Sequence, residues 1–301
     1  MTMVKRLLSS NTSDILSMTS KELKQSIKAS EGRVILSENV VIAEPFISDI
    51  TNSEIAKAFG ADLILLNALD VFNPEIKGLE HDKDNFVDKL HKLTGRPIGV
   101  NLEPVDKDAQ MLEDKTSISD GRQASVDTFK KIESLNMDFV CLTGNPGTGV
   151  TNNLIEESVR CARENFSGLI IAGKMHGAGV DEPVLDVNVT KKLIDNGADI
   201  ILVPSIGAIA GVSPEDVKRV VNYAHKRDVL VMSAIGTSQE GSSPETIRYM
   251  AIQNKMCGVD IQHIGDAGYG GMAPVENIFE MSKAIRGIRH TVSMVSRSVN
   301  R

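Results

Sequence analysis

The chain of 301 residues contains no tryptophan, and its few phenylalanines and tyrosines bring the aromatic share to only 4%. Base stacking and aromatic cages need such rings, and a net charge of −7 is the wrong sign for a phosphate backbone. Both observations argue against nucleic acid as the main partner. No apolar run approaches the length of a membrane span, and the apolar part of the N-terminus is too short for a secretory signal.

Cysteine is also rare, with Cys141, Cys161 and Cys257 scattered along the chain. Their spacing fits neither a disulfide framework nor a metal cluster, so we predict buried thiols in a reducing cytoplasm. Hydrophobic residues make up 41% of the chain and charged residues 24%, as expected for a globular protein with a sizeable core.

Apolar runs of strand length recur at fairly regular intervals, and each is nearly continuous, as in strands buried on both faces. Helical patterns lie between them, for example over Asn153–Phe166, Asp216–Lys226 and Glu245–Met256. Alternating strands and helices predict an α/β fold with a parallel sheet, and eight such units favour a closed (β/α)8 TIM barrel. The predicted strands are Val34–Ser37, Leu63–Asn67, Pro97–Leu102, Phe139–Thr143, Leu169–Gly173, Ile200–Pro204, Val229–Ala234 and Val259–Ile264.

We predict one barrel domain over residues 1–301. A capping box at Thr19–Glu22 opens a helix that ends at Gly32, so residues 1–32 are interpreted as an N-terminal helical cap over the bottom of the barrel. A solvated surface helix is the alternative. Residues 275–301 are interpreted as a C-terminal helix, in one piece or in two pieces around Gly287.

A short motif ending in aspartate stands immediately before alternate strands, at Asp62, Asp138, Asp199 and Asp260. It divides the predicted barrel into four quarters. The aspartates lie at the bottom of the barrel, where residues serve stability rather than chemistry. We therefore predict a structural role for them.

Two connections are unusually long, residues 71–85 after the second strand and residues 104–120 after the third. Both lie on the face where the strands end, so either is a lid or a surface insertion that contacts another subunit. With the terminal helix they offer more surface than one barrel needs. We predict a homo-oligomer.

The stretch Val259–Pro274 runs from a strand through several glycines to the start of a helix. Bare backbone amides at a helix N-terminus bind anions, and the last two loops of a TIM barrel are the usual phosphate site. A glycine-rich turn without a ligand is the alternative. The predicted phosphate-binding residues are Gly236, Thr237, Ser238, Gly268, Gly270 and Gly271.

Polar residues stand where the predicted strands end. Alternation along a strand points Asn101 the same way as Glu103, and Lys174 the same way as His176, so that inward-pointing faces would bring a carboxylate, an ammonium and an imidazole together in the mouth. We predict catalytic roles for Lys174, His176 and Glu103, the lysine as base, anion clamp or Schiff-base former. A Lys174–Glu103 ion pair and core imidazoles are the structural alternatives. The predicted substrate-binding residues are Glu38, Asn67, Asn101, Asn145, Ser205, His263 and Asp266.

No tightly spaced ligand set marks a metal site, and the glycines at 144–149 lack the Gly-Lys-Ser/Thr of a P-loop. We therefore expect no cofactor. A divalent ion such as Mg²⁺, held through water by Glu38, Glu103 or Asp266, is the alternative.

Several of these motifs together resemble a bacterial family of TIM-barrel proteins of unsettled function. They are Leu65-Leu-Asn67, Asn101-Leu-Glu-Pro104, Thr143–Gly149, Lys174-Met-His176 and Gly265–Gly271. Members of that family accompany sugar-uptake genes and are sometimes labelled phosphoenolpyruvate phosphomutase-like or hydrolase-like. The resemblance covers nearly the whole chain and implies the barrel and a phosphorylated metabolite. It supplies no catalytic residues, and the Asp-rich metal-binding strand ends of the phosphomutases are not visible here.

The sequence predicts an enzyme that acts on a small phosphorylated sugar or sugar acid by enolisation or carbon–carbon bond cleavage, as an isomerase, epimerase or lyase. One alternative is a metal-dependent phosphate-ester hydrolase. Another is a non-catalytic barrel that binds a sugar phosphate for regulation, since a phosphate loop fits both classes.

Overall fold

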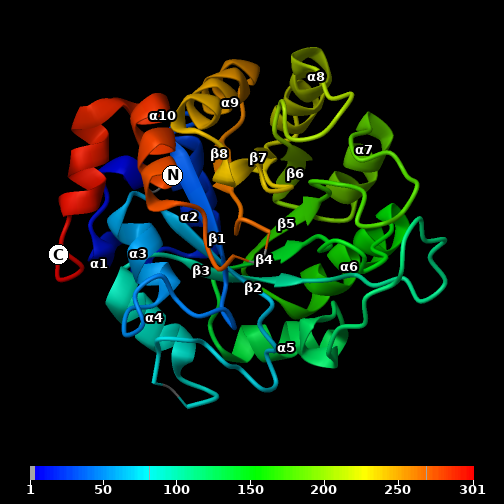
Figure 1. Ribbon diagram of the computed structural model, residues 1–301, viewed down its shortest axis with the longest axis horizontal. Helices are drawn as coiled ribbons and strands as arrows, with labels where there is room; N and C mark the ends of the chain where they lie inside the picture. The colour runs from blue at the N-terminus through cyan, green and yellow to red at the C-terminus, as the bar shows by residue number, and fades with distance from the viewer. Residues whose placement is uncertain (1–3, 81, 269) are drawn as a thin grey trace.

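The computed structural model describes residues 4–80, 82–268 and 270–301. Eight parallel strands of these residues pair in chain order, and β8 pairs with β1, so the barrel is closed (Figure 1). The predicted (β/α)8 fold is confirmed. The strands are β1 (Val34–Val40), β2 (Leu63–Asn67), β3 (Ile98–Leu102), β4 (Phe139–Leu142), β5 (Leu169–Gly173), β6 (Ile200–Pro204), β7 (Leu230–Ile235) and β8 (Ile261–Ile264).

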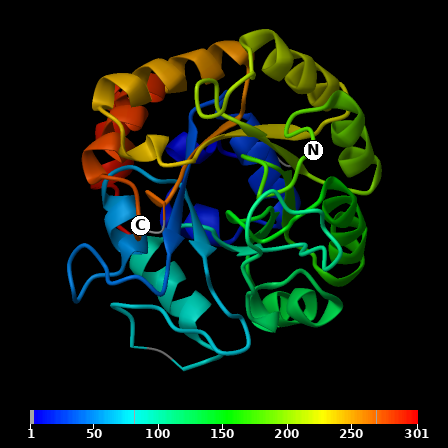
Figure 2. The same ribbon diagram turned by 45° about the vertical axis from the view of Figure 1, so that its right-hand side comes forward.

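Helices surround the barrel and connect successive strands (Figure 2). Several begin at side-chain caps, such as Thr19 before α2, which the sequence predicts, and Ser213 before α8. The helices are α1 (Thr12–Leu16), α2 (Ser20–Lys28), α3 (Asn52–Ala58), α4 (Phe86–Thr94), α5 (Val126–Ser134), α6 (Asn152–Asn165), α7 (Val187–Asp195), α8 (Pro214–His225), α9 (Pro244–Cys257) and α10 (Val275–Ser296). Short 3-10 turns lie at η1 (Leu7–Ser9), η2 (Asp120–Arg122) and η3 (Gln239–Gly241).

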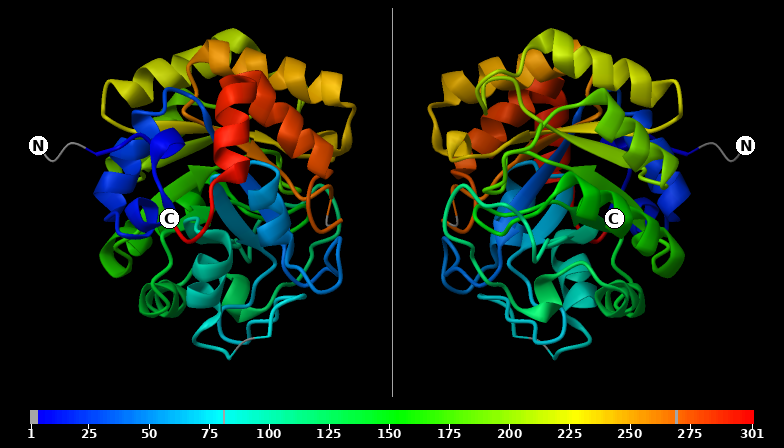
Figure 3. Two further views of the ribbon diagram at one scale, coloured as in Figure 1. Left: turned by 90° about the vertical axis from the view of Figure 1, so that its left-hand side faces the viewer. Right: turned by 90° about the vertical axis from the view of Figure 1, so that its right-hand side faces the viewer.

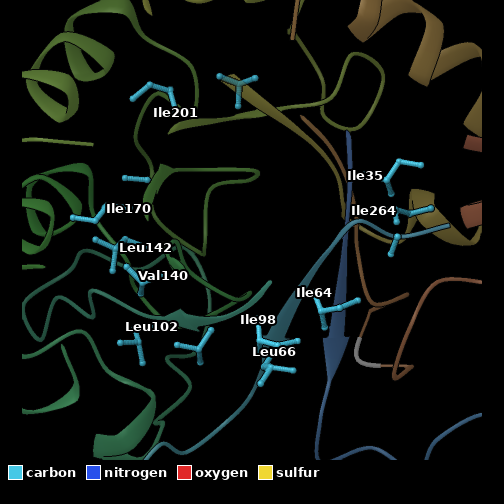
Figure 4. Close-up of a cluster of buried hydrophobic side chains, with 14 of the residues drawn as sticks. Ile35, Ile64, Leu66, Ile98, Leu102, Val140, Leu142, Ile170, Ile201 and Ile264 are labelled. Atoms are coloured by element: carbon cyan, nitrogen blue, oxygen red, sulfur yellow. The ribbon is translucent and has the colours of Figure 1, made fainter. Parts of the chain in front are cut away.

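The strands carry two apolar layers because successive side chains point to opposite faces. Outward residues such as Ile64 and Val140 pack beneath the helices in one cluster, part of which Figure 4 shows. Inward residues such as Leu65 and Cys141 form a second cluster inside the barrel. Both layers are buried, which explains why the strands are nearly continuous in apolar residues.

The N-terminal segment lies at one end of the barrel, opposite the loops that follow the strands (Figure 3). Leu7, Ile15, Leu23 and Ile27 are buried and join the inward cluster of the strands. The segment therefore covers the bottom of the barrel, and the chemistry is left to the other end. α10 runs as one element with a kink at Gly287, where a positive φ of 70° interrupts the helical backbone.

Each aspartate of the repeated motif makes the same two backbone hydrogen bonds. Its amide donates to the carbonyl of a residue near the start of the preceding strand, and its Oδ2 accepts the amide of that same residue. The pairs are Asp62 with Ile35, Asp138 with Ile98, Asp199 with Ile170 and Asp260 with Val231. We call each pair an aspartate clamp. The clamps tie odd to even strands at the bottom, so the structural role predicted for these residues is confirmed.

Candidate functional site

A small cavity of about 90 Å³ opens at the end of the barrel where the strands finish. Carboxylate, amide, hydroxyl and imidazole groups from several different strand ends and loops line it. The lining residues are Glu38, Asn101, Thr143, Gly144, Asn145, Pro146, Met175, His176, Gly236, Thr237, Ser238, Glu240, Gly265, Asp266 and Gly268. The mouth of the barrel is where TIM-barrel enzymes carry their active sites.

Glu38 extends from β1 into this lining and is almost fully buried. Its Oε2 lies 2.8 Å from Nε2 of His263, which comes from β8 and is itself completely buried. Burial raises the pKa of Glu38, although the hydrogen bond from His263 lowers it in part. Glu38 therefore binds a proton more readily than a carboxyl group in water does.

His176 follows β5 and lines the same cavity. Its Nδ1 accepts the backbone amide of Ala178 at 3.0 Å, so a neutral imidazole carries its proton on Nε2. Burial, and after it the charge of Lys174, lowers the pKa of His176. The ring is therefore neutral at pH 7 and offers one N–H donor.

Glu103 lies behind the lining and holds Asn145 in place. Its Oε2 accepts the backbone amide of Asn145, and its Oε1 accepts the side-chain amide of Asn145 and one N–H of Arg122, each at 2.8 Å. Asn145 in turn exchanges hydrogen bonds with Asn67, whose Nδ2 also donates to Asp266. This network runs from Arg122 to Asp266 and fixes two lining residues.

Lys174 is buried but does not line the cavity. Its Nζ pairs with Glu182 at 2.9 Å, and the same oxygen of Glu182 accepts the amide of Asn152 at the start of α6. The expected convergence of Lys174 with Glu103 therefore does not occur. Strand alternation stops at Gly173, where β5 ends with a φ of 148° and a Cβ would lie 2.2 Å from the Leu202 carbonyl oxygen.

Ser205 is not at the mouth either. Leu202 points into the barrel, so Ser205 faces outward, and its Oγ accepts a hydrogen bond from Asn254 of α9. Of the predicted phosphate-binding residues, Gly236, Thr237, Ser238 and Gly268 line the cavity, whereas Gly270 and Gly271 do not. Phosphate binding at these loops stays a prediction.

Three residues that the sequence analysis did not select also belong to the site. Thr143 and Glu240 line the cavity, and Arg122 supports Glu103. Thr143 is the last inward position of the fourth predicted strand, so strand alternation was a sufficient signal for it. Glu240 and Arg122 stand in loops, where no periodic pattern shows which way a side chain points.

The predicted lid segment after β3 packs over the loops that follow β4 and β5. Asp106, Leu112 and Thr116 donate backbone hydrogen bonds to Gly149, Gly179 and Gly147, respectively. The segment therefore covers one side of the mouth. Across residues 4–80, 82–268 and 270–301 no group of three or more His, Cys, Asp and Glu side chains is placed to hold a metal ion.

A closed parallel barrel with polar groups converging at its carboxyl end defines a TIM-barrel protein. Within that class the chain belongs to the family described as "Domain of unknown function (DUF7916)", whose profile matches residues 8–301. That description names no activity, so the association with sugar uptake implied by the resemblance stays a prediction. A search of curated proteins found no match.

Solved structures share the fold. A 2,3-dimethylmalate lyase of the PEP mutase/isocitrate lyase superfamily is 12% identical, with a TM-score of 0.51 over 83% of this chain and 82% of that one. An archaeal fructose-1,6-bisphosphate aldolase, with its catalytic lysine bound to a carbinolamine intermediate, is 15% identical, with a TM-score of 0.51 over 89% and 95%. At such identities the likeness shows the barrel alone.

No helix in the described ranges is long and apolar enough to cross a membrane.

Proposed function

We propose that the protein is an enzyme of the isomerase or lyase type that acts on a small sugar or sugar acid by enolisation or carbon–carbon bond cleavage. The observation that carries the proposal is that Glu38 and His176 line one cavity. Enolisation needs a base for the proton on the carbon next to a carbonyl and a donor for the carbonyl oxygen. A carboxylate with a neutral imidazole supplies this pair.

Glu38 is the base in this proposal. It removes a proton from the carbon and returns it to the neighbouring carbon or to solvent, so that no external reagent is consumed. Burial raises its pKa towards the operating pH, which is where a general base works best. His263 holds the carboxylate from behind through the 2.8 Å hydrogen bond.

His176 is the electrophile. Its Nε2–H donates to the carbonyl oxygen as negative charge develops there, because Nδ1 is occupied by the amide of Ala178. Asn101 and Asn145 orient the substrate, and Glu103 serves as a positioning residue through its three hydrogen bonds.

The aldolase neighbour has a catalytic lysine bound to a carbinolamine intermediate. The geometry here does not favour the same role for Lys174, whose ammonium is paired with Glu182 outside the cavity lining. We propose instead that Lys174 supports the loop after β5 on which His176 stands. A role for Lys174 as base or anion clamp would require the Glu182 pair to open.

A lyase and an aldolase on the same fold support the proposal that this protein is an enzyme. The amide and carboxylate groups of the lining support a sugar as substrate, because they can exchange hydrogen bonds with hydroxyl groups. A phosphate on the substrate would bind at the loops after β7 and β8. Those loops also bring Glu240 and Asp266 into the lining, so we place any phosphate at the outer rim of the cavity and keep the term deep cavity for its inner part.

Exchange of solvent deuterium into candidate substrates, followed by ¹H NMR, tests the proposal. The panel consists of three- to six-carbon aldoses, ketoses and sugar acids, each with and without phosphate. We expect exchange next to the carbonyl of at least one compound, and a loss of about 10²- to 10⁴-fold in Glu38→Gln.

Glu164→Gln is the matched control, because Glu164 is exposed on α6. Wild-type protein that exchanges no compound of the panel would contradict the proposed reaction. Full exchange by Glu38→Gln would contradict the role of Glu38. Binding of a sugar without any exchange would favour the regulatory barrel over the enzyme.

A further inference from the structure

The cavity contains buried polar atoms that have no hydrogen-bond partner among the described residues. They are Oδ1 of Asn101, Oγ1 of Thr143 and Oε2 of Glu240. Asn101 and Thr143 both occupy inward positions of adjacent strand ends, where β3 pairs with β4. Polar atoms buried without partners are costly, so their presence around one cavity indicates a ligand that satisfies them.

These atoms require hydrogen-bond donors as partners. Oδ1 of Asn101 and Oε2 of Glu240 are acceptors, and the Thr143 hydroxyl both accepts and donates. The lining also includes the carboxyl groups of Glu38 and Asp266, and neither lysine nor arginine occurs among its residues. An ionised phosphate has only acceptor oxygens, so the carboxyl groups of the lining repel it and no cationic side chain of the lining offsets that repulsion.

We infer that the deep cavity binds the polyhydroxy end of a substrate, with hydroxyl groups donating to Asn101, Thr143 and Glu240, and that this end carries no phosphate. The inference rests on the proposed function in treating the bound molecule as a substrate, and it adds the chemical class of the group that the site binds. It limits phosphate, if the substrate carries one, to the other end of the molecule.

An ammonium group also donates hydrogen bonds, but it gains from a site with full negative charge. Burial raises the pKa of Glu38 and of Glu240, so both carboxyl groups take up protons more readily than in water. This shift weakens the attraction of the site for a cation, and an ammonium must also give up its hydration to enter the cavity, so we expect a neutral donor to bind more tightly. Its volume of about 90 Å³ is small beside a typical ligand pocket, which suits a short polyol chain.

Ligand-observed NMR titration with three four-carbon compounds tests the inference. Erythritol presents only hydroxyl groups, erythritol 4-phosphate adds an anion, and 2-amino-1,3,4-butanetriol replaces one hydroxyl group by an ammonium. We expect erythritol to compete with 2-amino-1,3,4-butanetriol and to bind about tenfold more tightly. We expect the phosphate ester to bind no more tightly than erythritol, because its free hydroxyl end alone enters the cavity.

Thr143→Val removes the hydroxyl group at constant shape and should weaken erythritol binding roughly 5- to 10-fold, the equivalent of one hydrogen bond. Ser233→Ala is the matched control. Ser233 also has a buried hydroxyl group without a partner, but Met232 and Ala234 beside it face the barrel interior, so Ser233 faces the helices. Both variants should retain or raise the melting temperature, and only Thr143→Val should lose affinity.

Tighter binding of erythritol 4-phosphate or of 2-amino-1,3,4-butanetriol than of erythritol would overturn the inference, as would unchanged affinity in Thr143→Val. The outcome of the deuterium-exchange experiment does not depend on these binding results. Polyol binding that depends on Thr143, without exchange into any sugar, would retain the binding inference and remove the proposed reaction.

Discussion

Asp62 combines an aspartate clamp with an ion pair that is buried on both sides. Its Oδ2 accepts the amide of Ile35 and lies 2.7 Å from Nη1 of Arg286, and the two side chains are 1% and 0% exposed. Asp62→Ala leaves the guanidinium without its counter-charge, which costs about 3–5 kcal/mol when a buried ion pair loses one partner. Arg286 keeps bonds to Gly60 and Ser282, so we expect about 4 kcal/mol in total.

Asp260→Ala is the matched control, since Asp260 makes the same clamp with Val231 but its partner His225 is 41% exposed. Loss of that clamp leaves one backbone amide unpaired, which costs about 1–3 kcal/mol. Urea unfolding at constant m-value measures both variants. In the double variant Asp62→Ala with Arg286→Met, the stranded charge is gone and about 2 kcal/mol should return.

A cost for Asp62→Ala no larger than that for Asp260→Ala would refute this reasoning, because the buried ion pair would then add nothing to the clamp. Failure of Arg286→Met to restore stability would refute it as well. A total stability of about 5–15 kcal/mol is typical of folded domains, so the expected loss is large enough to measure.

Two further predictions follow from ion pairs. The hydrogen bond that His225 donates to Asp260 raises the pKa of His225, so its stabilisation is complete below about pH 6.5 and is lost as the pH rises through the folded-state pKa. The free energy of unfolding, measured in urea, should fall more between pH 6 and 8 in wild type than in His225→Gln, by under about 1 kcal/mol at this exposure. Lys174→Met should cost about 1–2 kcal/mol, because water reaches the partly exposed Glu182. Borohydride trapping with keto sugars should add no mass to the wild-type peptide around Lys174, and an adduct there would restore the Schiff-base role.

The fold could be predicted from the sequence because its signals are local and repeated. The strands, the cap at Thr19 and the clamp aspartates each follow from the chain's periodicity or from a residue type at a fixed position. β1 is longer than predicted and extends to Val40, because the polar residues Glu38 and Asn39 are buried within it. Polarity suggested the end of a strand there, whereas the barrel mouth requires polar residues inside one.

The site could be predicted only as far as regular structure continues. Asn101 and His263 both lie at inward strand positions, but only Asn101 lines the cavity, whereas His263 is buried and bonded to Glu38. Lys174 and His176 lie beyond the last residue of β5, where alternation no longer holds, so that His176 lines the cavity and Lys174 pairs with Glu182. Glu240 depends on the path of the loop after β7, which local sequence does not specify.

The two ends of the barrel differ in what their buried polar groups surround. At the bottom each aspartate of the repeat accepts a backbone amide of the preceding strand, and the apolar N-terminal segment covers the end. Buried atoms without a partner among the described residues occur at both ends, for example Oδ1 of Asp62 at the bottom. At the mouth, however, three such atoms, from Asn101, Thr143 and Glu240, surround one cavity. Unpaired buried polar atoms cost stability, so their convergence on a cavity is the reason to look for the chemistry of this chain at the mouth.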